Sequence, residues 1–235
     1  MMNKVLCSLL LFLSISCGLQ GRNANYARDS KRIWLDSKEI HHGEYVWKMK
    51  KAGDVISSAE KVSTLGYDTS DWLSAIVPGT VLNSLVYNKE YPEPYYGVNN
   101  KLESGKIPDI SKVGREFYTY WFRTEFDVPE SFAGKTIWLQ PDGVNYRAEI
   151  WVNGNLLSTL NGMFISDYIN VTDFVKVGRK NILAVKVYPV NVPGTTMPKS
   201  WGATGEFHNG GNGNIGLNTT MLMSVGWDFT FMDGI

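Results

Sequence analysis

Short segments in which apolar and polar residues alternate recur along the chain. Alternation with a period of two is the pattern of a β-strand that places one face in a core. This pattern, or a short aromatic and apolar run, occurs at residues 45–50, 116–126, 135–140, 146–152, 155–160, 164–171, 181–188 and 218–224. Seven or eight strands at a spacing of roughly ten residues are typical of an antiparallel sandwich. We therefore predict an all-β, antiparallel jelly-roll β-sandwich with a short helix and long loops.

Three local signals refine this pattern. Asn153-Gly154 separates two of the predicted strands, and both residues tolerate the positive φ of a type I′ hairpin turn. Thr80 follows the Pro78-Gly79 turn and can cap a short helix over residues 81–87. Residues 91–97 combine Pro92 and Pro94 with three tyrosines, which excludes a regular helix or a central strand. We expect this segment to be an ordered aromatic loop.

The first 17 residues predict a targeting segment. Residues 5–15 are an apolar run preceded by Lys4, and the run is shorter than the ~20 residues that span a bilayer. Residues 13–17 resemble a bacterial lipoprotein cleavage site, in which Cys17 becomes the lipid-attachment residue; plain secretion is the alternative. In both cases we expect export, either as a periplasmic or cell-envelope lipoprotein or as a secreted protein. The expected organisation is a signal peptide at 1–17, a polar linker at 18–31 and one domain at 32–235.

Composition narrows the function classes. Lys plus Arg number 23 and Asp plus Glu number 23, so the formal net charge is zero, which argues against a nucleic-acid partner. Cys7 and Cys17 both lie in the targeting segment, which excludes a disulfide, a cysteine zinc site and a cysteine nucleophile from the rest. Residues 211–216 match G-x-G-x-x-G but follow no hydrophobic strand, so we expect a loop there. The chain is expected to need no metal and no cofactor.

Six segments in register carry a family resemblance. They are residues 72–81, 91–97, 117–126, 142–154, 181–187 and 226–229. Together they resemble the N-terminal domain of glycoside hydrolase family 2 enzymes, in the branch of β-mannosidases and exo-β-D-glucosaminidases. The resemblance covers about residues 30–235 and implies a galactose-binding-like jelly roll. In that family, immunoglobulin-like sandwiches and a TIM barrel with two catalytic glutamates follow. The chain ends at Ile235 without such a barrel, so we expect a truncated or fragmentary reading frame with no catalytic residue.

The resemblance also implies substrate-site residues. Trp227 and Asp228 match a segment that reaches the active site in related enzymes, where the Asp helps to bind the sugar. A carboxylate can accept two hydrogen bonds from sugar hydroxyls, and an indole offers a flat apolar face. Phe229 departs from the family pattern, which has a second Trp there, and a core Trp227 with a turn at Asp228 is the alternative. Tyr95 and Tyr96 are further candidates that could line a sugar cleft or pack against a following domain. The strand aromatics are expected in the core instead: Tyr118, Tyr120, Trp121 and Trp151.

The leading functional hypothesis follows from this resemblance. We expect the N-terminal domain, or a fragment, of an exported exo-β-glycosidase that hydrolyses terminal bonds of β-mannosides or β-glucosaminides. Its partners would be carbohydrate and the downstream domains of the same polypeptide, with a membrane tether through a lipidated Cys17. A free-standing carbohydrate-binding module or lectin-like lipoprotein is the alternative, and a structural domain without a ligand is the third. The chain alone is expected to hydrolyse nothing.

Overall fold

The computed structural model describes residues 32–38, 45–99, 104–108, 113–145, 147–162 and 165–189. The chain divides into two compact units, Met1–Trp34 and Leu35–Ile235. Of the first unit only residues 32–34 are described, and they have no regular secondary structure. All features below belong to the second unit.

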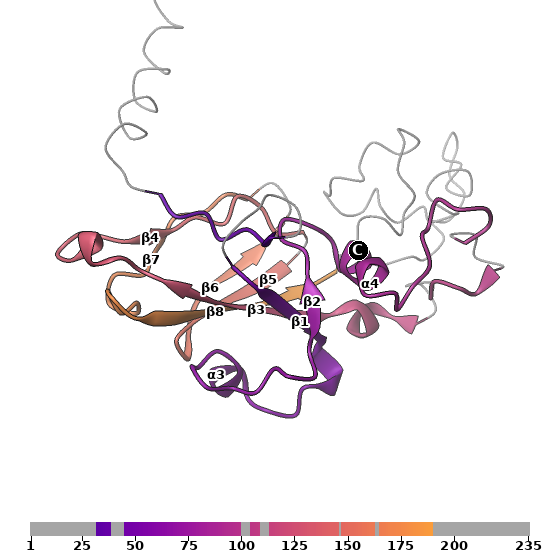
Figure 1. The fold of residues 1–235 in the computed structure, drawn as a ribbon, viewed down its shortest axis with the longest axis horizontal. Helices are drawn as coiled ribbons and strands as arrows, with labels where there is room; N and C mark the ends of the chain where they lie inside the picture. Colours follow the sequence, from indigo (N-terminus) through magenta and orange to yellow (C-terminus); the bar gives the residue numbers. More distant parts are fainter. Residues whose placement is uncertain are drawn as a thin grey trace, which may run out of the picture. The chain divides into compact units, whose positions relative to one another are not determined.

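The described part of the second unit is built on antiparallel β-sheets, as predicted (Figure 1). The larger sheet has six strands in the order β2-β1-β3-β8-β5-β6, and a smaller sheet pairs β4 with β7. Every strand pair in both sheets is antiparallel. The strands are β1 (Trp47–Lys51), β2 (Leu73–Ala75), β3 (Tyr120–Asp127), β4 (Trp138–Leu139), β5 (Arg147–Val152), β6 (Asn155–Asn161), β7 (Ile169–Asn170) and β8 (Lys180–Tyr188).

The helices in the described part are short. They are α3 (Ala59–Val62), α4 (Val81–Tyr87) and the 3-10 turns η1 (Ala52–Asp54), η3 (Arg115–Tyr118) and η4 (Glu130–Phe132). The predicted helix is confirmed as α4, and the Thr80 hydroxyl oxygen accepts a hydrogen bond from the Asn83 N–H at 2.9 Å. The sequence did not predict α3, because four residues are too few to show a helical period.

The face of the six-stranded sheet that looks toward β4 and β7 carries one layer of the core. Met49, Phe122, Val185 and Ile150 are opposite one another in register across β1, β3, β8 and β5, and all four are buried. Figure 1 shows β4 and β7 on one side of this sheet and α3 on the other. A second, smaller sheet on one side of the larger one is the arrangement of a sandwich.

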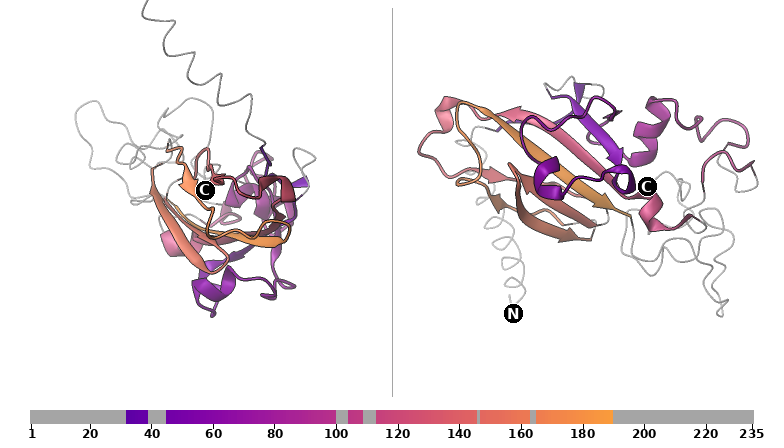
Figure 2. Two further views of the ribbon diagram at one scale, coloured as in Figure 1. Left: turned by 90° about the vertical axis from the view of Figure 1, so that its left-hand side faces the viewer. Right: turned by 90° about the horizontal axis from the view of Figure 1, so that it is seen from below.

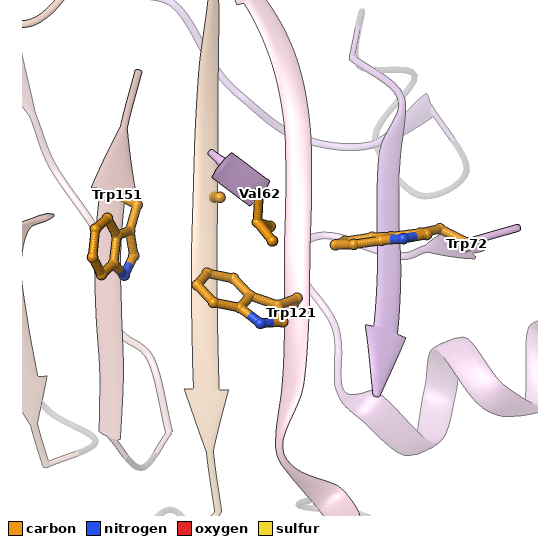
Figure 3. Close-up of a cluster of buried hydrophobic side chains, with 5 residues drawn as sticks. Val62, Trp72, Trp121 and Trp151 are labelled. Atoms are coloured by element: carbon orange, nitrogen blue, oxygen red, sulfur yellow. The ribbon is translucent and has the colours of Figure 1, made fainter. Parts of the chain in front are cut away.

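The opposite face holds a tryptophan cluster under α3. Trp72, Trp121 and Trp151 lie around Val62 of α3 (Figure 3), and Ala184 of β8 belongs to the same buried cluster. In the right-hand view of Figure 2, which is seen from below Figure 1, α3 lies over the sheet. The buried Arg123 fixes the end of α3, because its Nε and Nη2 atoms donate to the Val62 and Thr64 carbonyl oxygens, both at 3.0 Å.

The predicted hairpin and the predicted core aromatics are confirmed. Asn153 has a φ of 46° and Gly154 a φ of 88°, as a type I′ turn between β5 and β6 requires. The four aromatics predicted in the core are buried, with exposed fractions of 2% for Tyr118 at the end of η3, 6% for Tyr120, 3% for Trp121 and 8% for Trp151.

Three predicted strands differ in extent from the observed ones. The segment 116–126 begins as the 3-10 turn η3, and its strand starts only at Tyr120. The segments 135–140 and 164–171 contain strands of only two residues each. Strand β4 stops at Leu139, one residue short of the residue before which pairing must end, because Pro141 has no N–H to donate. Strand β7 stops at Asn170, whose side chain accepts a hydrogen bond from the Thr172 N–H. Strand β2 was not predicted, and the predicted strand at 218–224 lies outside the described residues.

Candidate functional site

The aromatic loop predicted at residues 91–97 begins at a firmly anchored helix end. The Asn88 side chain, directly after α4, accepts a hydrogen bond from Ser74 N at 3.2 Å and donates to Ser74 O at 2.7 Å. The Ser84 hydroxyl of α4 accepts from Ile76 N at 3.0 Å. These bonds tie the middle and the C-terminal end of α4 to the segment of β2, so the loop starts from a fixed position.

A buried asparagine closes the loop on its other side. Asn99 is 6% exposed, and its Nδ2 donates to the Glu93 carbonyl oxygen at 2.8 Å. Lys106 Nζ donates to Asn99 Oδ1 at 2.8 Å, and the Tyr96 N–H donates to Glu93 O at 3.3 Å. The chain between residues 93 and 99 is therefore a closed and ordered turn, as predicted.

Tyr95 and Tyr96 lie side by side in sequence on this ordered loop, and both rings face outward. Their exposed fractions are 61% and 77%. Exposed aromatic rings on an anchored loop are suited to stacking on a ligand or a partner domain, because the loop is already ordered before it binds. The structure thus gives both candidate residues the exposure that the hypothesis needs.

A layer of tyrosines lies behind the loop. Burial raises the pKa of Tyr91, and a hydrogen bond with Tyr118 opposes that shift. The Tyr118 hydroxyl donates to the Pro108 carbonyl oxygen at 2.5 Å, and burial also raises the pKa of Tyr120. Tyr91 and Tyr120 therefore stay neutral at physiological pH, and Tyr118 acts as a structural hydrogen-bonding group.

A second polar group, which the sequence did not reveal, lies on the α3 side of the larger sheet. We call Arg147, Glu149, Lys186 and Tyr188 the Tyr188 cluster. The Tyr188 hydroxyl donates to Glu149 Oε1 at 2.5 Å, and Trp151 Nε1 donates to Glu149 Oε2 at 3.3 Å. The Arg147 guanidinium carbon lies 4.0 Å from the centre of the Tyr188 ring, and Lys186 Nζ lies 5.2 Å from it.

The electrostatics of the Tyr188 cluster favour a structural role. Burial and the hydrogen bond to Glu149 raise the pKa of Tyr188, so its hydroxyl remains a donor. Both Glu149 oxygens accept hydrogen bonds from neighbouring strand residues, which holds this carboxylate in a fixed position. The only sequence signal was the charged residue at position 186 between apolar neighbours, and cross-strand register supplies the rest.

The other predicted site residues lie outside the described part of the chain: Trp227, Asp228 and Cys17. Within the described ranges, no group of three or more His, Cys, Asp or Glu residues could hold a metal ion. The same ranges contain no helix with the length and apolar character needed to cross a membrane.

Comparison with known proteins identifies a family of domains to which the chain is similar. The model of the family described as glycosyl hydrolase 2 galactose-binding domain-like matches residues 47–232. The mannosylglycoprotein endo-beta-mannosidase of Lilium longiflorum is 37% identical over 161 residues, which are 68% of this chain and 16% of that protein. The exo-beta-D-glucosaminidase of Amycolatopsis orientalis is 29% identical over 149 residues, which are 62% of this chain and 13% of that protein.

A solved structure gives the same result. The exo-chitosanase of Amycolatopsis orientalis, in complex with PNP-beta-D-glucosamine, superimposes with a TM-score of 0.52 at 27% identity. The match covers 63% of this chain and 17% of that chain. In each of these relatives, the present chain corresponds to a small part of a much longer protein. The chain belongs to the galactose-binding-like domain family of glycoside hydrolase family 2.

Proposed function

We propose that the chain serves as the N-terminal domain of a longer, exported glycosidase that hydrolyses β-mannosides or β-glucosaminides. The observation that carries this proposal is that the chain belongs to a glycosidase domain family and matches only a small part of each relative's length. Relatives named for these activities are several times longer, and the matched region makes up 16% and 13% of two of them. A domain of this size in such a protein supports the reaction that another part performs.

The described residues agree with a supporting role. Strongly shifted ionisable groups mark catalytic sites when they sit in a cleft beside a charge partner. Here the phenols with the largest shifts, Tyr120 and Tyr188, are strand residues buried in the sheet. The exposed pair Tyr95 and Tyr96 can contact a sugar through the faces of their rings.

The proposed substrate contacts are Trp227 and Asp228, with Tyr95 and Tyr96 as a second pair. The carboxylate would accept hydrogen bonds from neighbouring hydroxyls, and the rings would stack on the sugar. Export, with lipid attachment at Cys17 as one route, is part of the proposal. The relatives are named for both endo and exo action, so the bond that is cleaved is a question for the assay.

The test compares the 235-residue chain with the full product of the gene that encodes it. We expect the longer product to release p-nitrophenol from the β-mannoside or the β-glucosaminide, and the 235-residue chain to release none. Exo action requires turnover of these monosaccharide substrates, whereas endo action requires cleavage within an oligosaccharide. Turnover by the purified 235-residue chain, or a full gene product of only this length, would refute the proposal.

A free-standing sugar-binding module is the second candidate, and the exposure of Tyr95 and Tyr96 favours it. It predicts that the native product is of the size of this chain and that it binds mannose or glucosamine oligomers. Binding should then weaken in Trp227→Ala and in Tyr96→Ala, as titration calorimetry would show.

A further inference from the structure

Two Asn-Gly pairs lie in the hairpin of β5 and β6. Asn153-Gly154 forms the turn between the strands, and Asn161-Gly162 stands where β6 ends. In such a pair the backbone nitrogen of the glycine can reach the side-chain carbonyl carbon of the asparagine, because glycine has no side chain to hinder the approach. Attack at that carbon closes a five-membered succinimide ring. The two pairs have the same local chemistry, so the surrounding structure decides which of them reacts.

Both reacting groups of the first pair are held by hydrogen bonds. Asn153 Nδ2 donates to the Phe174 carbonyl oxygen at 2.7 Å, and Asn153 Oδ1 accepts from the Ile182 N–H at 2.9 Å. The Gly154 N–H, which is the attacking group, donates to the Ser63 carbonyl oxygen at 3.0 Å. Ring closure at Asn153 therefore requires these bonds to break first.

The reacting groups of the second pair are not held in this way. Asn161 is exposed, and no hydrogen bond joins its side chain to another described residue. The Gly162 N–H likewise donates to no backbone carbonyl of the described residues. Asn161 is also the last residue of β6, which is an edge strand of the larger sheet. Strand ends with a neighbour on one side open locally at a low free-energy cost, so the attacking conformation is accessible there.

We propose that Asn161 is a site of spontaneous deamidation, which gives Arg147 of the Tyr188 cluster a carboxylate partner. The Gly162 nitrogen forms a bond to the side-chain carbonyl carbon of Asn161, and the bond from that carbon to Nδ2 breaks. The amide nitrogen leaves as ammonia and carries away the proton that the Gly162 N–H gives up. One water molecule then opens the succinimide at either of its carbonyls, which yields aspartate or isoaspartate. Water is the only co-reactant.

The new carboxylate would form opposite a cation that has no ion-pair partner. Arg147 is the cross-strand partner of Asn161, and the Cβ atoms of residues opposite each other lie about 4.5–5.5 Å apart. The Arg147 guanidinium stacks on the Tyr188 ring and forms no ion pair with a described carboxylate. Deamidation would also change the formal net charge of the chain from zero to −1. This modification does not depend on the glycosidase activity proposed above.

The test incubates the folded 235-residue chain at neutral and at mildly alkaline pH and reads both pairs in one tryptic peptide, residues 148–176. Tandem mass spectrometry locates the mass gain. We expect position 161 to convert at least about tenfold faster than position 153, because the bonds that hold Asn153 must break before it reacts. In concentrated urea the two positions should convert at similar rates. Conversion should be faster at the higher pH, since the Gly162 nitrogen must lose its proton to attack.

Two variants complete the test. Asn161→Gln keeps an amide but would need a larger ring, so it should remain unconverted at that position over the same time, and thermal unfolding checks that it is folded. Asn161→Asp supplies the carboxylate directly and should raise the Tm at low salt, a gain that high salt removes and that is absent in the Arg147→Gln background.

Three results would overturn the proposal. The first is conversion in the folded chain that is as fast at position 153 as at position 161. The second is an intact Asn161 in the folded chain after a time in which both positions convert in urea. The third is a gain in Tm from Asn161→Asp that is equal with and without Arg147, because the new carboxylate would then have a different partner.

Discussion

The side chain of Asn181 connects the start of β8 to two neighbouring turns, and changing it to Asp tests that role. Asn181 is fully buried. Its Nδ2 donates to the Lys176 and Arg179 carbonyl oxygens, both at 2.9 Å. Its Oδ1 accepts from Asn153 Nδ2 at 2.8 Å and from Lys176 N at 2.7 Å. All four hydrogen-bonding positions of the amide are therefore in use.

Asn181→Asp keeps the shape and both accepted bonds but replaces the donor with an oxygen that faces two carbonyls. Each buried carbonyl left without a partner costs about 1–3 kcal/mol, so we expect a loss of about 2–6 kcal/mol in the free energy of unfolding at neutral pH. A domain has about 5–15 kcal/mol in total, so the loss is a large share of its stability. Asn83→Asp is the control, because Asn83 is exposed in the first turn of α4, where an added carboxylate is neutral or slightly favourable.

Urea unfolding followed by tryptophan fluorescence measures this loss, with the slope m as a check that the unfolded state has not changed. Burial and the facing carbonyls should raise the pKa of the new carboxyl above its unfolded value of about 3.9. The stability difference from the parent should then shrink as pH falls through the folded-state pKa, because a protonated carboxyl regains one donor. A loss below about 1 kcal/mol at pH 7, or a difference that does not shrink in acid, would refute the reasoning.

Three further predictions concern other parts of the described fold. Val62→Ala removes two methyl groups from between the tryptophans under α3, and should cost about 2–3 kcal/mol in urea unfolding; a cost below about 0.5 kcal/mol would show that the cluster repacks freely. Thr80→Ala should cost about 1 kcal/mol through loss of the α4 cap, whereas Ser58→Ala should cost less because its capping bond is 3.5 Å long; equal losses would contradict this. The pKa of Tyr188 is raised by burial and by Glu149, so the stability it contributes is full below its unfolded pKa of about 10 and is lost as pH rises through the folded value. Tyr188→Phe should therefore be less stable than the parent at pH 7 by about 1–3 kcal/mol yet lose less of its own stability above pH 10, and parallel pH profiles would exclude this role.

Local signals predicted those elements whose cause is local. The positive φ values at Asn153 and Gly154 and the hydroxyl cap at Thr80 each depend on a few adjacent residues, and both elements were found where they were expected. The alternation in residues 181–188 predicted β8 almost to the residue, because a central strand has a clear pattern on both faces.

The elements that the sequence did not predict depend on distant partners. Strand β2 has three residues and exists because Trp47, Lys48 and Met49 pair with it. Helix α3 depends on Arg123, which is about 60 positions away in sequence and donates to the carbonyl of Val62, its last residue, and to that of Thr64 just beyond it. The Tyr188 cluster forms because cross-strand register places Glu149 beside Lys186 and Arg147 beside Tyr188, and no single strand shows that arrangement. Among the candidate site residues, Tyr95 and Tyr96 could be predicted to lie on a loop because two prolines exclude regular structure there, whereas their exposure is seen only in the structure.

The short strands of the smaller sheet explain how Trp138 and Tyr168 can stay exposed. A long, flat, apolar strand edge invites pairing with another chain and is an aggregation site. Here Pro141 follows β4 after one residue, and the Asn170 side chain captures the Thr172 N–H directly after β7. The described backbone therefore offers only a short edge, while the outward face of the two strands remains wide enough for two aromatic rings. Short strands beside exposed rings thus limit edge-to-edge pairing without burying Trp138 or Tyr168.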